Sequence, residues 1–159
     1  MKKINKFSKY KIFIPILILL IVFYFTFIVK NNSNFVPISS KELNLHIMVP
    51  SHYKVTQEFH TLKISNQKDE IVISTYGSFY NNLESHFRDL SKKNNVKIDV
   101  MQKYNDNFYK VKFNHSYNQR PEDITYIILN GYTIHTFTAN SEELYSDLDA
   151  IAKSFRYNP

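Results

Sequence analysis

The chain has 159 residues, with 20 Lys and Arg against 14 Asp and Glu, no cysteine and two glycines. The absence of cysteine excludes a disulfide framework, thiol chemistry and a lipid-modified cysteine, and two glycines are too few for a Walker or dinucleotide-binding loop. Six of the basic residues lie in residues 1–30, which hold no carboxylate, so the remaining 14 basic and 14 acidic residues balance and no nucleic-acid partner is expected.

Residues 12–29 (IFIPILILLIVFYFTFIV) form an uncharged apolar run. At about 1.5 Å per residue, a helix of this length measures roughly 27 Å, close to the hydrocarbon core of about 30 Å. Pro15 falls in the first turn, where its missing N–H breaks no helical hydrogen bond. Lysines without any acidic residue precede the run, which predicts a cytoplasmic N-terminus. We therefore expect a cytoplasmic basic segment over 1–11 and a single-pass transmembrane signal-anchor over 12–29, held in the lipid bilayer of the cytoplasmic membrane.

The residues after this run bear on whether it is an uncleaved anchor or a cleaved signal peptide. A signal peptide has an apolar region of about 7–15 residues before small residues at its cleavage site. Here the run is longer and a Lys-Asn-Asn sequence follows it, so the pattern favours the uncleaved anchor. The polar segment 30–41, which includes Pro37, predicts a linker, and residues 42–159 predict one extracytoplasmic domain. The composition, rich in Lys, Asn, Ile and Tyr, is typical of a low-GC bacterium.

The domain is predicted to consist mainly of strands. Over 43–49 apolar residues alternate with polar ones, which is the period-two pattern of a half-buried strand. Asn130-Gly131 is typical of a type I′ turn and predicts a hairpin that pairs 125–129 with 132–136. Further strands are predicted over 53–59, 61–65, 70–75, 96–100, 109–113 and 123–129, the last of them apolar on both faces.

Two helices are predicted, each with one apolar stripe. Asn82 caps a helix that continues to about Lys93. Its stripe consists of Leu83, Phe87 and Leu90. Ser141 begins the second helix, whose stripe consists of Leu144, Leu148, Ile151, Ala152 and Phe155. Strands that pair locally, with helices packed on them, predict the α+β class: one antiparallel sheet with packed helices.

The order of these elements and a few residues at their ends carry a family resemblance. The opening strand ends at Val49-Pro50 before Tyr53, a tyrosine-rich late hairpin surrounds Asn130-Gly131, and the closing helix ends at Ser154-Phe155-Arg156. Over roughly residues 42–157 the domain resembles the Mog1/PsbP-like fold of small exported or membrane-tethered bacterial proteins. That family is mixed in function, since PsbP assists photosystem II and Mog1 binds a small GTPase. The resemblance implies a binding or accessory role and supplies no catalytic residue.

Catalytic and metal-binding patterns are absent from the sequence. The six histidines form no H-E-x-x-H or other recognised ligand spacing. His46 and His135 alternate with core positions, so we expect both to face solvent. No G-x-S-x-G is present, although residue types alone leave a Ser/His/carboxylate hydrolase open. We therefore predict no enzyme activity and assign no catalytic residue, cofactor or metal.

Two groups of residues are candidates for binding. Tyr76, Phe79 and Tyr80 follow a strand and precede a helix, where aromatic rings either line a ligand groove or seal the edge of the core. Tyr117 and Arg120 lie in the longest loop between predicted strands, which is either a partner-binding loop or an ordinary polar one. The leading hypothesis is a non-enzymatic accessory module that binds a membrane or envelope protein at the membrane surface. The alternative is a small-ligand or lipid-binding domain.

Overall fold

The computed structural model describes residues 34–94, 96–115 and 123–157. No helix in these described residues is long and apolar enough to cross a membrane. The segments predicted to be cytoplasmic and transmembrane, together with Tyr117 and Arg120, lie outside the described residues. The expectations for them therefore stay predictions.

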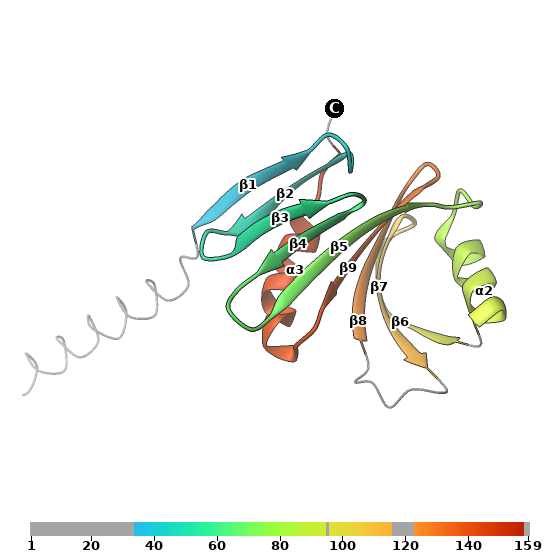
Figure 1. The fold of residues 1–159 in the computed structure, drawn as a ribbon. Coiled ribbons are helices and arrows are strands. Elements are labelled where there is room, and N and C mark those ends of the chain that lie inside the picture. Colours follow the sequence, from blue (N-terminus) through green and yellow to red (C-terminus); the bar gives the residue numbers. More distant parts are fainter. Residues whose placement is uncertain (1–33, 95, 116–122, 158–159) are drawn as a thin grey trace, which may run out of the picture. The chain divides into compact units, whose positions relative to one another are not determined.

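A seven-stranded antiparallel sheet makes up most of the domain (Figure 1). Its strand order is β3-β4-β5-β9-β8-β7-β6, so every neighbouring pair is also consecutive in the chain except β5 and β9. The predicted antiparallel sheet is thereby confirmed. The strands are β3 (Lys54–Glu58), β4 (Thr61–Ser65), β5 (Glu70–Gly77), β6 (Val96–Asn105), β7 (Phe108–His115), β8 (Asp123–Asn130) and β9 (Thr133–Ala139).

The predicted linker over 30–41 is wrong from Phe35 onward, because the chain there forms strand β1 (Phe35–Ser40). β1 pairs antiparallel with β2 (Leu45–Pro50), and the two form a separate sheet where a single sheet was expected. Polar residues and Pro37 conceal this strand in the sequence. β1 is paired on one side only, however, and an edge strand accepts proline.

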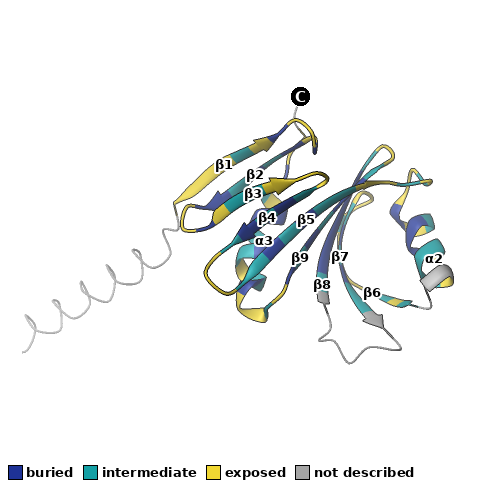
Figure 2. Ribbon diagram, viewed as in Figure 1, coloured by how far each residue is buried: buried dark blue, intermediate teal, exposed yellow. Residues whose placement is uncertain are grey.

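Two helices cover opposite faces of the large sheet. α3 (Tyr145–Ser154), preceded by the short 3-10 helix η2 (Glu142–Leu144), packs with β2 on one face, and α2 (Leu83–Asn94) covers the other face over β7, β8 and β9. On β8, Tyr126 and Ile128 join the core on the α3 side, whereas Ile127 joins the core on the α2 side. This division follows from the alternation of side chains along a strand. Figure 2 shows the buried residues concentrated in the central strands.

The predicted helix stripes and caps are confirmed with one difference. Leu83 and Phe87 are buried, whereas Leu90 is half-buried. Side-chain oxygens of Asn82 and Ser141 accept backbone N–H groups at 2.8 and 3.2 Å. The stripe predicted for the last helix is buried along its whole length: Leu144, Leu148, Ile151, Ala152 and Phe155.

The hairpin of β8 and β9 has a different turn from the predicted one. Asn130 pairs with Thr133, so the loop residues are Gly131 and Tyr132. Within this turn φ is positive only at Gly131 (+58°), which is the pattern of a type II′ turn. The pairing along the hairpin differs from the prediction by two residues, so each side chain keeps its predicted face of the sheet.

The prediction that His135 faces solvent is wrong. Its side chain is fully buried, its Nδ1 shares a hydrogen bond of 3.0 Å with Thr75 Oγ1, and its ring centroid lies 4.9 Å from that of Phe155. β9 lies between β5 and β8, and a hydrophobic core covers each face of the sheet there. Alternating positions on β9 therefore do not separate a buried face from a solvent-facing one. Burial lowers the pKa of His135 to about 4. His46 is half-buried, with Nδ1 2.7 Å from Ser39 Oγ.

Candidate functional site: an exposed aromatic end of the sheet

The sheet carries exposed aromatic side chains at the end where β5 terminates. The exposed fractions are 91% for Phe79, 87% for Phe59, 63% for Tyr132 and 40% for Tyr76. We term these four residues the aromatic end. A single exposed apolar side chain is common on protein surfaces. Several large ones gathered at one place are uncommon and indicate an interaction surface.

Three neighbouring connections bring these residues to the same end. Phe59 lies in the turn between β3 and β4, Tyr76 and Phe79 lie at and after the end of β5, and Tyr132 lies in the turn between β8 and β9. The backbone N–H of Thr75 donates to the carbonyl of His60 at 2.9 Å, which joins the first connection to β5. Figure 2 shows exposed residues in these connections. Strand spacing of about 4.8 Å places the outermost two tips roughly 10–15 Å apart across the sheet.

Hydrogen bonds hold the segment after β5 against the last hairpin. The N–H of Ser78 donates to the carbonyl of Tyr132 at 2.6 Å, and Ser78 Oγ accepts the N–H of Tyr80 at 3.0 Å. The backbone of this segment is therefore fixed while the ring of Phe79 projects into solvent. A rigid backbone under an exposed ring lowers the entropy that is lost when the ring is buried by a partner.

Phe59 has a backbone conformation that is sterically unfavourable for a residue with a side chain. Its φ is +45°, in the left-handed region that costs an L residue roughly 1–2 kcal/mol. Two-residue hairpin turns usually place Gly, Asn or Asp at such positions. A Phe that is both strained and 87% exposed contributes little to folding, which points to a role outside the core.

His86 lies beneath the aromatic end on the first turn of α2. Its side chain is buried, its Nδ1 is 3.5 Å from Ser78 Oγ, and its ring centroid is 6.2 Å from that of Tyr76. No hydrogen-bond partner in the described part of the chain reaches its Nε2. Burial lowers the pKa of His86, an effect partly offset by the nearby charge of Asp89, and this buried ring supports the fold beneath the aromatic end.

The predicted groove of Tyr76, Phe79 and Tyr80 is only partly assembled. Tyr76 and Phe79 lie at the aromatic end, whereas Tyr80 is half-buried. Three surface cavities are found in the described residues, and none of them is lined by Tyr76, Phe79 or Tyr80. The sequence analysis did not identify Phe59 and Tyr132 as site residues. Gly, Asn and Asp are the usual residues of a two-residue hairpin turn, so an aromatic residue there points to a role in binding.

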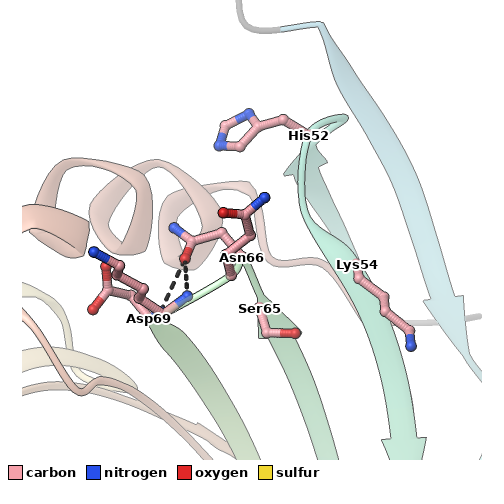
Figure 3. Close-up of a pocket in the computed structure, with 7 residues that line it drawn as sticks. His52, Lys54, Ser65, Asn66 and Asp69 are labelled. Carbon is pink, nitrogen blue, oxygen red and sulfur yellow. Dashed lines mark hydrogen bonds between the residues drawn. The ribbon is translucent and has the colours of Figure 1, made fainter.

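Three surface cavities lie elsewhere in the described residues. The largest, about 680 Å³, surrounds the turn between β4 and β5 and is lined by His52, Lys54 and residues 65–69 (Figure 3). Asn66 Oδ1 accepts the N–H groups of Lys68 and Asp69 there, so its amide oxygen serves the turn. A second cavity of about 500 Å³ lies between α3 and the turn joining β6 and β7, and a third of about 230 Å³ lies between β1, β2 and β3. No group of three metal-ligating side chains occurs among the described residues.

Comparison with known proteins identifies the fold. No protein-family model and no curated protein matches the chain. The solution structure of cyanobacterial PsbP (CyanoP) from Synechocystis sp. PCC 6803 superposes with a TM-score of 0.52 at 10% identity, covering 79% of this chain and 94% of that one. A crystal structure from Bacteroides thetaiotaomicron VPI-5482 gives 0.47 at 10% identity, covering 77% of this chain and 48% of that one. The resemblance to the PsbP-like fold is confirmed at the level of the fold.

Proposed function

From the PsbP-like fold and the aromatic end, we propose that this chain is a membrane-anchored, extracytoplasmic accessory module that binds a protein partner at the membrane surface. The apolar run over 12–29 behind a basic N-terminus supports the anchor and its orientation. The proposal assigns no catalytic residue and no cofactor.

The aromatic end is the observation that carries the proposal. Protein interfaces are enriched in aromatic residues, and their energetic centres are commonly Tyr or Trp rings seated in a pocket of the partner. Four exposed rings on a fixed backbone offer several hundred Å² of mostly apolar surface, a substantial part of the roughly 800 Å² that one side of a standard interface buries. Tyr117 and Arg120 remain a second predicted contact, in the connection between β7 and β8.

Anchoring bears directly on the strength of such an interaction. A module held in the same membrane as its partner meets it at an effective concentration that reaches the millimolar range for short linkers. At such a concentration, weak contacts through a few aromatic rings are sufficient for the module to bind its partner. We therefore expect binding to be impaired when residues 1–33 are replaced by a cleaved signal peptide.

Site-specific photo-cross-linking in intact cells tests the proposal. A photoreactive phenylalanine analogue replaces Phe79, and a matched control carries it at Lys68, an exposed residue at the opposite end of the sheet. We expect one discrete protein adduct from position 79 and none from position 68. The adduct is expected to disappear when Phe59 and Tyr132 are both replaced by Ser, because the rest of the apolar surface is then lost.

Two results would contradict a protein partner. If the adduct at position 79 persists in the Phe59→Ser, Tyr132→Ser background, the aromatic end does not determine binding. If only lipid adducts form, the alternative of a lipid-binding domain is favoured, since aromatic rings also settle at the headgroup level of membranes. Cross-linking from Tyr117 and Arg120 separates the two candidate surfaces.

A further inference from the structure

The cavity between α3 and the turn joining β6 and β7 has the composition of a ligand site. We term it the α3 pocket. Its volume of about 500 Å³ falls in the range of small-molecule sites. Apolar side chains form one part of the lining and polar ones the other. The apolar part consists of Phe108, Ile128, Ala152, Phe155 and Tyr157, and the polar part of Asn105, Asp106, Asn107, Lys153 and Arg156.

The aromatic part of the lining is held in place by its own contacts. The rings of Phe155 and Tyr157 meet edge to face with centroids 5.1 Å apart. The hydroxyl of Tyr157 donates to the carbonyl of Leu129 at 3.2 Å, so its polar end is already used by the fold. An apolar group that enters the pocket therefore meets ring surface and no unsatisfied hydroxyl.

The charged residues of the α3 pocket differ in whether they have a partner. Lys153 Nζ lies 2.6 Å from Asp149 Oδ2, and Asp106 Oδ1 lies 2.8 Å from Lys103 Nζ. Arg156 has no carboxylate partner among the described residues. Within the described part of the chain, the pocket thus presents one cation, Arg156, without a carboxylate partner.

Arg156 is oriented by backbone groups. Its Nη1 donates to the carbonyls of Phe155 at 2.6 Å and Lys153 at 3.3 Å, as a cap on the C-terminus of α3. Its own backbone exchanges two hydrogen bonds of 2.8 Å with His46 on β2. No partner in the described residues takes up its Nε and Nη2 donors. A guanidinium fixed in this way suits the two oxygens of a carboxylate.

We propose that the α3 pocket binds an organic carboxylate with an aromatic or branched apolar body, the carboxylate pairing with Arg156 and the body covering Phe108, Phe155 and Tyr157. Arg156 is the cation of this lining that has no carboxylate partner among the described residues, and Asp106 also lines the pocket, so the site matches a monoanion and disfavours phosphates of higher charge. The same chemistry belongs to a free small acid and to the C-terminal residue of a peptide.

Calorimetry on the full chain in lipid nanodiscs, with empty nanodiscs as the blank, tests the proposal. The probes are 3-phenylpropionate and its neutral amide, 3-phenylpropionamide. We expect the acid to bind at least about tenfold more tightly than the amide, the size of effect typical of a charge-assisted hydrogen bond. Equal affinities, or no measurable binding of either probe at millimolar concentration, overturn the proposal.

A matched pair of variants assigns the charge. Arg156→Gln is expected to remove most of the preference for the acid and Arg156→Lys part of it, whereas Lys153→Gln changes the affinity less than about threefold because Lys153 already pairs with Asp149. Equal losses in Arg156→Gln and Lys153→Gln overturn the assignment. If Arg156→Gln does not fold, the contrast between acid and amide in the unmodified chain decides the question.

A second probe pair distinguishes the two sources of the carboxylate. N-acetyl-Gly-Phe with a free C-terminus is compared with its C-terminal amide. Binding of the free peptide at least as tight as that of 3-phenylpropionate supports a peptide C-terminus, and binding of the small acid alone supports a free acid. Because the α3 pocket shares no residue with the aromatic end, failure of this proposal leaves the proposed protein-binding role untouched, and the reverse also holds.

Discussion

Two groups of aromatic residues in this domain have opposite surroundings. On the α3 side, the hydroxyl of Tyr53 donates to Asp147 at 2.6 Å and that of Tyr126 to Asp149 at 2.5 Å. Burial, together with these carboxylates, raises the pKa of both hydroxyls far above the ordinary value. At the aromatic end, Phe59 and Phe79 are almost fully exposed.

The difference shows which aromatic residues the fold itself requires. Rings on the α3 side are buried and their hydroxyls have partners, so they are explained by packing. Rings at the aromatic end are exposed, and one of them also strains the backbone, so packing does not explain them. Surface exposure and backbone strain separate the two groups, whereas residue type does not.

The largest expected contrast is between a buried and an exposed phenylalanine. Phe137 is fully buried against Phe155, so Phe137→Ala is expected to lower the free energy of unfolding by about 3–5 kcal/mol. Phe79→Ala is expected to change it by less than about 0.5 kcal/mol. Urea unfolding followed by tyrosine fluorescence measures both, since the chain has no tryptophan. A cost above about 1 kcal/mol for Phe79→Ala would mean that the fold uses this ring.

A smaller effect is expected at the carboxylate that joins α3 to the sheet. Asp149→Ala leaves the buried Tyr126 hydroxyl without its acceptor, which costs roughly 1–3 kcal/mol. In the Tyr126→Phe background the same substitution is expected to cost clearly less, because the only hydroxyl that then loses an acceptor is that of the half-buried Tyr104, 3.5 Å from Asp149 Oδ1. Equal costs in the two backgrounds would show that the hydrogen bond contributes nothing to stability.

The buried His135 predicts how stability depends on pH. Its pKa is about 4 in the folded chain and about 6.5 when unfolded. The unfolded chain therefore binds more protons between these values, so this contribution is fully present above pH 6.5 and is lost as the pH falls toward 4. Urea midpoints at pH 7, 6 and 5 are expected to fall less steeply in His135→Gln. A remaining slope is expected from His86, whose pKa burial also lowers; identical slopes in both proteins would contradict the prediction.

The smallest contrast in the free energy of unfolding is expected at Phe59, where one substitution is expected to increase stability and weaken partner binding. Phe59→Gly is expected to raise the free energy of unfolding by about 0.5–1 kcal/mol, because glycine adopts the positive φ of this turn without strain. The same substitution is expected to weaken the cross-link from position 79. Phe79→Gly is the control, since Phe79 has no positive φ and no gain is expected. A loss of stability in Phe59→Gly would show that the ring is needed for the turn.

Patterns confined to one element predicted that element well. Leu144, Leu148 and Ile151 recur at helical spacing, and all three are buried. The alternation of Leu45, Ile47 and Val49 likewise marks the buried side of β2. These predictions succeed because the period of an isolated helix or strand decides which side chains share a face.

Predictions that depend on neighbouring elements were less successful. Phe35–Ser40 was predicted as a linker because only its pairing with β2 reveals a strand. His135 was placed in solvent because its strand alternates, yet neighbours on both faces bury it. The turn after β8 lies one residue later than predicted, at Gly131-Tyr132 instead of Asn130-Gly131. The register in which β8 and β9 pair decides between these two turns.

By itself, the sequence determined the α+β class, the two helix stripes and the likeness to a PsbP-like fold, and it predicts the membrane anchor. Only the tertiary structure decided that Phe59, Tyr76, Phe79 and Tyr132 share one end of the sheet. It also decided that Arg156 lines the α3 pocket without a carboxylate partner among the described residues. The physical reason is the range of the interactions involved. Periodicity and capping act within a few residues along the chain, whereas exposure and charge pairing depend on which distant segments the fold places side by side.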